Sequence, residues 1–231
     1  MKILAIDSAA KQASLAVWEN GRLLAQVYID VGMTHSQTLM PAAENLLSAA
    51  KLQIEDIGLF AVSKGPGSFT GVRIGVAAAK GMAAALSKPC IGVSTLEAMA
   101  ENLRLPFEFY GCAVMDARRE QVYNALFHYK NGGIIRLCED RAISVHGLIN
   151  ELSKLSPFPV ILVGDGADLC YNNRASLSEI YKAPPHLLYS CAAGVAAVAE
   201  RLYSEDADFD PGELAPEYLR LSQAERERNS V

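Results

Sequence analysis

The sequence predicts an α/β fold made of two similar halves, each with three strands, a helix, a strand and a second helix. An apolar strand that ends in aspartate occurs twice, at 3–7 (ILAID) and at 109–116 (FYGCAVMD). Each is followed by two strand-like runs separated by Asn-Gly, a dipeptide that favours a tight hairpin because both residues accept positive φ. Each half then reaches a strand that ends in a glycine-rich turn, at Gly65 and at Gly164.

The first half contains two longer helical patterns. Apolar residues recur at helical spacing over 34–50, where Thr34 and Gln37 fit a capping box and Pro41 predicts a kink or a restart. A Gly- and Ala-rich helix is expected at 70–86, with Ser68 as its cap and Thr70 as a competing cap. The other elements expected in this half are strands at 3–7, 13–18, 22–29, 57–65 and 90–94, and a short helix at 95–103.

The second half repeats this order. Strands are expected at 109–116, 121–129, 134–139 and 159–167, a helix capped by Ser144, and a closing helix at 192–203. This duplication is the layout of the actin-like, sugar-kinase-like (ASKHA) α/β fold. We therefore expect an N-terminal subdomain at 1–103, a C-terminal subdomain at 104–221 and a charged tail at 222–231.

Composition limits the classes of function. The chain has 231 residues, of which 51% are apolar, and a net charge of −5, which argues against a protein that grips nucleic acid by itself. Five cysteines without a CxxC pair indicate reduced thiols. No signal peptide and no apolar stretch long enough to span a bilayer are recognisable, so a cytoplasmic protein without membrane contact is expected.

The stretch SKGPGSFTGVRIG at 63–75 resembles a phosphate-binding loop but matches no such motif. A P-loop requires lysine after its last glycine, and the dinucleotide fingerprint would need glycine at position 70. Gly71 and Gly75 share one face of the predicted helix, and glycine there costs about 1 kcal/mol relative to alanine. Close packing, either on a partner or inside the same domain, would offset that cost, and spacing alone does not separate the two.

Other candidate sites are weak. Kinases of this fold hold ATP phosphates through a glycine just after the first aspartate, whereas Asp7 is followed by Ser-Ala-Ala. Asp7, Asp116, Gly164 and Gly166 are therefore interpreted as vestigial nucleotide turns, although turn aspartates commonly cap backbone N–H groups. The four histidines show no metal-ligand spacing, and no G-x-S-x-G elbow occurs.

Six stretches together resemble the TsaB (YeaZ) family over residues 1–221. They are ILAIDSA, GPGSFTGVRIG, GVSTLEAMA, MDARREQVY, GDGA and PEYLR. The resemblance implies a role in forming N6-threonylcarbamoyladenosine (t6A) at position 37 of tRNAs that read ANN codons. It implies a non-catalytic subunit that binds the paralogue TsaD together with the ATPase TsaE, meets tRNA only within that complex, and forms a homodimer without TsaD. It implies no cofactor on this chain alone, with ATP or ADP held weakly or at the TsaD interface.

The chain differs from TsaD where the metal ligands of that family are expected. TsaD-like proteins carry a histidine-rich segment after this helix and strand, whereas this chain has Ser94, Thr95 and Glu97 there. These side chains do not replace a pair of imidazoles. We therefore expect no metal and no catalytic residue, which also argues against the peptidase once assigned to this superfamily.

The resemblance implies docking through the helices at 34–50 and 68–86, as a four-helix contact with the partner. A small-molecule kinase or ATPase is the alternative function. The residues expected at the partner or dimer interface are Thr34, His35, Leu39, Ala43, Leu46, Gly71, Arg73, Ile74, Gly75, Ala78 and Met82.

Overall fold

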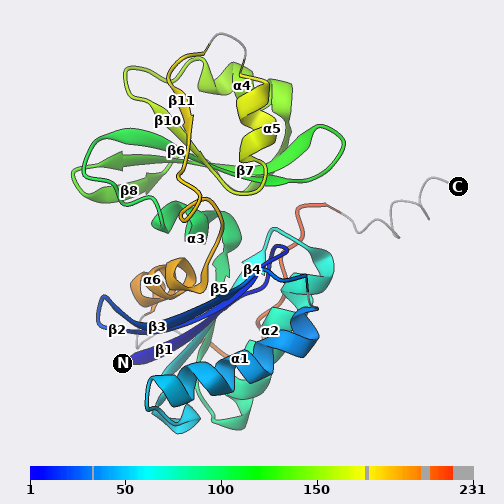
Figure 1. Ribbon diagram of the computed structural model, residues 1–231, viewed down its shortest axis with the longest axis vertical. Helices are drawn as coiled ribbons and strands as arrows, with labels where there is room; N and C mark the ends of the chain where they lie inside the picture. Colours follow the sequence, from blue (N-terminus) through cyan, green and yellow to red (C-terminus); the bar gives the residue numbers. More distant parts are fainter. Residues whose placement is uncertain (33, 175–176, 204–208, 221–231) are drawn as a thin grey trace, which may run out of the picture.

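The computed structural model describes residues 1–32, 34–174, 177–203 and 209–220. Two α/β halves are stacked along the long axis of the molecule, each with its own sheet (Figure 1). The predicted fold class is therefore confirmed. The charged tail expected at 222–231 lies outside the described residues.

The first sheet has the order β3-β2-β1-β4-β5. The first three strands form an antiparallel meander, and β1 pairs in parallel with β4, as β4 does with β5. Strand bounds are β1 Lys2–Asp7, β2 Ala13–Glu19, β3 Arg22–Ile29, β4 Leu59–Gly65 and β5 Cys90–Ser94.

Helices cover both faces of this sheet. On one face lie α1 (His35–Ala49) and α2 (Phe69–Ala85), whose apolar residues share a core with β1, β2 and β4. On the other face lie α3 (Thr95–Glu101) and α6 (Ala192–Leu202), as Figure 1 shows. A short 3-10 turn, η1 (Ile54–Asp56), precedes β4.

The second sheet has the order β11-β10-β6-β7-β8, and β9 also pairs with β7. Its elements are β6 Phe109–Asp116, β7 Gln121–Lys130, β8 Gly133–Arg136, β9 Arg141–Ser144, α4 Val145–Leu152, β10 Val160–Val163, α5 Ala167–Asn172 and β11 Ile180–Lys182. Three short elements were not expected from the sequence: β9, α5 and β11, which have only four, six and three residues.

The end of the chain departs from the expected division. Helix α6 packs on β1, β2, β4 and β5 of the first sheet rather than on the second. Residues 209–220 also return to the first half, where the Cys90 amide donates to the Phe209 carbonyl at 3.0 Å. The N-terminal unit is therefore completed by residues from the far end of the chain.

Helix capping follows the sequence at two of three positions. Ser68 and Ser144 accept hydrogen bonds from the amides of Gly71 and Gly147, as expected of N-caps. Thr34 makes no such bond, because its hydroxyl donates to the Gln37 side chain at 2.9 Å, so the predicted capping box is wrong. Helix α1 continues as α-helix through Pro41.

Candidate docking face and interdomain cleft

The glycine loop packs against the turn that follows β1. A Cβ on Gly67 would lie 2.2 Å from the Ala9 carbonyl oxygen, and one on Gly71 would lie 2.2 Å from the Ser8 carbonyl oxygen. A Cβ on Gly75 would lie 2.2 Å from Ser8 Oγ. Hydrogen bonds close the contact, since the Ser8 hydroxyl donates to the Gly71 carbonyl at 2.8 Å. The three glycines therefore serve the packing of α2 on its own domain.

This packing corrects part of the predicted interface. Leu39, Ala43 and Leu46 are 2%, 2% and 6% exposed and belong to the core beneath α1. Gly71 and Gly75 face the same core and are buried. That these five residues meet a partner stays a prediction, and their burial argues against it because their side of each helix already covers the sheet.

The remaining predicted interface residues are more accessible. Thr34 is exposed at the start of α1, and His35 is half-buried, with Nε2 2.8 Å from the Ala10 carbonyl oxygen. Ile74, Ala78 and Met82 are half-buried along one edge of α2, where they pack against the core.

Apart from Arg73, the exposed residues of α2 are not among the predicted interface residues. They include a stripe of small side chains, with no atom within 4 Å of a Cβ placed on Gly81. We call it the outer stripe of α2, and it consists of Thr70, Ala77, Gly81 and Ala84. Helical phase could have found it, since Gly81 lies on a different side of the helix from Gly71 and Gly75.

The exposed surface continues onto α1. Met40 is 44% exposed on this helix, which makes it one of the large apolar side chains that the fold leaves uncovered. A groove of about 470 Å³ runs between α1 and the edge strand β3, lined by Val27, Ile29, Pro41 and Ala42 among others. Met40 and the lining of this groove are uncharged, whereas Glu44 of α1 and Arg73 of α2 are exposed charged residues.

Residues 209–220 form a strap along the opposite edge of α2. Lys80 Nζ donates to the carbonyls of Gly212 and Leu214 at 2.9 and 2.7 Å. Arg73 Nε donates to the Tyr218 hydroxyl at 2.6 Å, and its guanidinium lies 3.8 Å from the centre of the Phe69 ring. The Arg73 side chain, expected at the interface edge, is thus held by its own chain.

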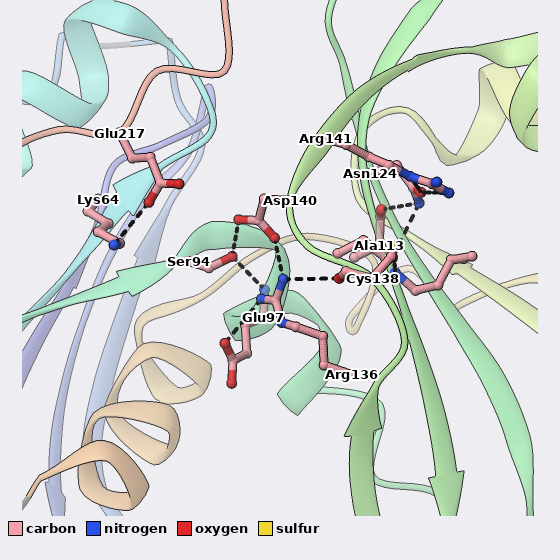
Figure 2. A network of polar contacts seen from close by, with 12 residues as sticks. Lys64, Ser94, Glu97, Ala113, Asn124, Arg136, Cys138, Asp140, Arg141 and Glu217 are labelled. Carbon is pink, nitrogen blue, oxygen red and sulfur yellow. Dashed lines mark hydrogen bonds and ion pairs between the residues drawn. The ribbon is translucent and has the colours of Figure 1, made fainter.

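Lys64 and Glu217 fix the strap to the end of β4. Their side chains form an ion pair at 2.9 Å, seen on the left of Figure 2. The Glu217 amide also donates to the Lys64 carbonyl at 2.7 Å. The strap therefore borders the outer stripe of α2.

A cleft of about 560 Å³ lies between the two halves. The first half lines it with the turn at 9–11 and the start of α2, and the second half with residues 115–118, Tyr123 and Asp165. Lys11 and Arg118 are the cations that face this space, and Asp116 and Asp165 the carboxylates.

The aspartates named as vestigial nucleotide turns hold backbone N–H groups. Asp7 is 2% exposed and accepts from the Ala9 amide at 3.1 Å, and Asp116 accepts from the Arg118 amide at 2.7 Å. The Asp116 amide in turn donates to Asp165 at 3.1 Å. Desolvation raises the pKa of the Asp165 carboxyl above its ordinary value, and the nearby Asp116 carboxylate adds to this rise.

Gly164 and Gly166 bring the second glycine turn close to the end of β6. A Cβ on Gly164 would lie 2.0 Å from the Val114 carbonyl oxygen, and one on Gly166 would lie 3.1 Å from the Met115 carbonyl carbon. Gly164 also has a φ of +111°, which L side chains rarely adopt. Both glycines therefore have a packing role here.

The described residues bear on two further classes of site. No group of three or more His, Cys, Asp or Glu side chains is arranged to hold a metal ion there. In the same part of the chain, the helices fall short of the length and apolar character needed to cross a membrane.

Comparison with known proteins agrees with the architecture. Residues 30–227 match the family model described as TsaD, tRNA N6-adenosine threonylcarbamoyltransferase. The tRNA threonylcarbamoyladenosine biosynthesis protein TsaB of Bacillus subtilis is 33% identical over 97% of this chain and 96% of its own length. The Escherichia coli protein of the same name is 30% identical over 97% and 96%.

Solved structures show the same fold. YeaZ from Pseudomonas aeruginosa superposes with a TM-score of 0.77 at 24% identity, covering 94% of this chain and 99% of that one. A second structure, described as similar to peptidase YEAZ from the same organism, gives a TM-score of 0.78 at 23% identity, with 95% and 99% covered.

Proposed function

Because this chain belongs to the TsaB (YeaZ) family of tRNA threonylcarbamoyladenosine biosynthesis proteins, we propose that it is the non-catalytic subunit that binds and activates TsaD. In this proposal it supports formation of t6A at position 37 of tRNAs reading ANN codons. TsaE joins the complex, tRNA is met only within it, and the same surface forms a homodimer when TsaD is absent.

The outer stripe of α2 is the observation that supports docking most strongly. Glycine in an exposed helix interior costs about 1 kcal/mol relative to alanine. Gly71 and Gly75 offset this cost by contacts inside the domain, but Gly81 has no neighbour within reach. A partner helix that packs closely on Gly81, Ala77 and Ala84 would supply the missing contact. The exposed Met40 of α1 would extend this contact.

The non-catalytic part of the proposal is supported by how the polar groups near the glycine loop are used. Ser68 accepts from the Gly71 amide as a helix cap, and its amide donates to the Ala9 carbonyl at 2.6 Å. The half-buried His35 lies against the Ala10 carbonyl. Neither side chain is arranged as a nucleophile with its base, which argues against a peptidase.

Affinity for TsaD tests the docking surface. Gly81→Leu should weaken binding about tenfold or more, a loss of at least about 1.4 kcal/mol, because its side chain fills the gap that a helix would occupy. Gly81→Ala is the matched control, which should fold at least as well and bind nearly as tightly. Calorimetric titration with TsaD measures both, and t6A formation in a mixture of TsaC, TsaD, TsaE, ATP, threonine, bicarbonate and tRNA measures activity. Equal affinity of both variants and the wild type would exclude this surface, and t6A formation unaffected by leaving the chain out would exclude an activating role.

Nucleotide at the junction with TsaD is a further part of the proposal. The cleft has room for a small ligand and carries both cations and carboxylates. In the turn after β1 the Ala9 amide already donates to Asp7, so this donor is not free for a phosphate oxygen. We therefore expect calorimetry to detect little Mg-ATP binding by the chain alone and more when TsaD is present. Tight binding with turnover by the chain alone would instead favour the kinase or ATPase alternative.

A further inference from the structure

A polar network crosses from one half of the molecule to the other beside α3. From the first half it takes Ser94, the last residue of β5, Glu97 of α3 and Arg201 of α6. From the second half it takes Arg136, the last residue of β8, and Asp140 in the following loop. Figure 2 shows Ser94, Glu97, Arg136 and Asp140 converging between the two sheets.

Both carboxylates of this network accept one hydrogen bond from the first half and one from the second. The Ser94 hydroxyl donates to one Asp140 oxygen at 2.5 Å, and Arg136 Nη1 donates to the other at 2.6 Å. Arg136 Nη2 reaches Glu97 Oε2 at 3.1 Å. Arg201 Nη2, on α6, donates to the remaining oxygen of Glu97 at 2.5 Å. The chain of contacts from α6 to the loop after β8 is therefore continuous.

Partial burial distinguishes these contacts from ordinary surface ion pairs. The Asp140 side chain is 8% exposed, and those of Arg136 and Glu97 are 23% and 24% exposed. Exposed pairs contribute little to stability, whereas charges shielded from solvent are screened less and lose more when a partner is removed. Most of the network is therefore shielded enough from solvent to influence the relative orientation of the two halves.

We propose that Asp140 and Arg136 form a latch that fixes the angle between the two halves and hence the width of the cleft. The latch couples β5, α3 and α6 of the first unit to β8 of the second, so that the chain behaves as one rigid body. Other contacts among the described residues also join the halves: the Tyr129 hydroxyl donates to the Ala100 carbonyl at 2.5 Å, and Arg220 Nη1 donates to the Ala117 carbonyl at 2.9 Å. The apolar side of α3 shares a core with the second sheet as well, so the latch acts on the orientation of halves that already touch. Loss of the Asp140 charge would leave Arg136 with Glu97 alone and weaken the coupling.

Residual dipolar couplings of the purified chain test this directly, without TsaD. In the wild type, backbone N–H couplings of both halves should fit one alignment tensor. In Asp140→Asn, the halves should require separate tensors, with reduced order in one of them. Glu151→Gln is the matched control, because it removes the carboxylate partner of Arg141 within the second half alone.

A second variant covers the case in which Asp140→Asn does not fold. Arg136→Lys keeps the charge but cannot hold Glu97 and Asp140 with a planar fork, so it should also lose the single tensor. A wild type that fails to fit one tensor would overturn the latch. A folded variant at Asp140 or Arg136 that fits one tensor as well as Glu151→Gln does would also overturn it.

Discussion

In both halves of the molecule a glycine loop packs against the end of the first strand, but the helix that follows the loop differs. In each, the first strand ends in an aspartate that accepts from the amide two residues later, Asp7 to Ala9 and Asp116 to Arg118. In each, a glycine loop after a parallel strand presses against that strand end. The sequence repeat thus corresponds to a repeated packing contact.

The halves differ in the helix that follows the loop. In the first half it is α2, with 17 residues, and Asp7 beneath it is 2% exposed. In the second half it is α5, with six residues, and Asp116 remains exposed on the cleft. The first half thus carries a long helix with an exposed outer face, whereas in the second half the turn remains exposed on the cleft.

The largest effect on stability is expected where α2 packs against the turn that follows β1. Gly75→Leu places a branched side chain where Ser8 Oγ and Val62 already leave no room for a Cβ. Overpacking of this kind should lower the free energy of unfolding by about 3 kcal/mol or more. Urea titration followed by circular dichroism measures the change.

Gly81→Leu on the same helix is the control for this variant. Its side chain enters open space, and leucine is the better helix former, so the free energy of unfolding should not fall. If the two variants were equally stable, the assignment of Gly75 to the inner face would be contradicted.

Some features of the fold and of the docking face could be predicted from the sequence, and others could not. Local signals predicted the strands of the first sheet, strands β6, β7, β8 and β10 of the second, and the sites of both turns. The direction of Gly71 and Gly75 could not be predicted, since α2 carries small or apolar residues on nearly every side and the spacing of two glycines does not say what lies opposite them. The return of α6 to the first sheet is a long-range contact without a local signal. The outer stripe could have been found by helical phase, because Gly81 lies on a different side of α2 from Gly71 and Gly75.

A smaller effect is expected at the glycine turn of the second half. Gly164→Ala would force a φ of +111° on a side chain and bring its Cβ against the Val114 carbonyl. We expect a loss of about 2 kcal/mol in the free energy of unfolding, from backbone strain and the clash together. An unchanged urea midpoint would show that the halves do not share this packing device.

The smallest effect on stability is expected from a substitution of Asp165, in the glycine turn of the second half. The folded-state pKa of Asp165 is raised, so the ionised carboxylate destabilises the folded state above that pKa, and this penalty disappears as pH falls below the ordinary value of 3.8. Asp165→Asn keeps an oxygen that can accept from the Asp116 amide but removes the charge. The variant should therefore be slightly more stable than the wild type at pH 7, by less than about 0.5 kcal/mol as is usual for exposed positions. The difference in stability should vanish at pH 3. Urea midpoints at pH 7 and pH 3 measure this difference. A variant that is less stable than the wild type at pH 7 would show that the Asp165 carboxylate stabilises the fold at the cleft.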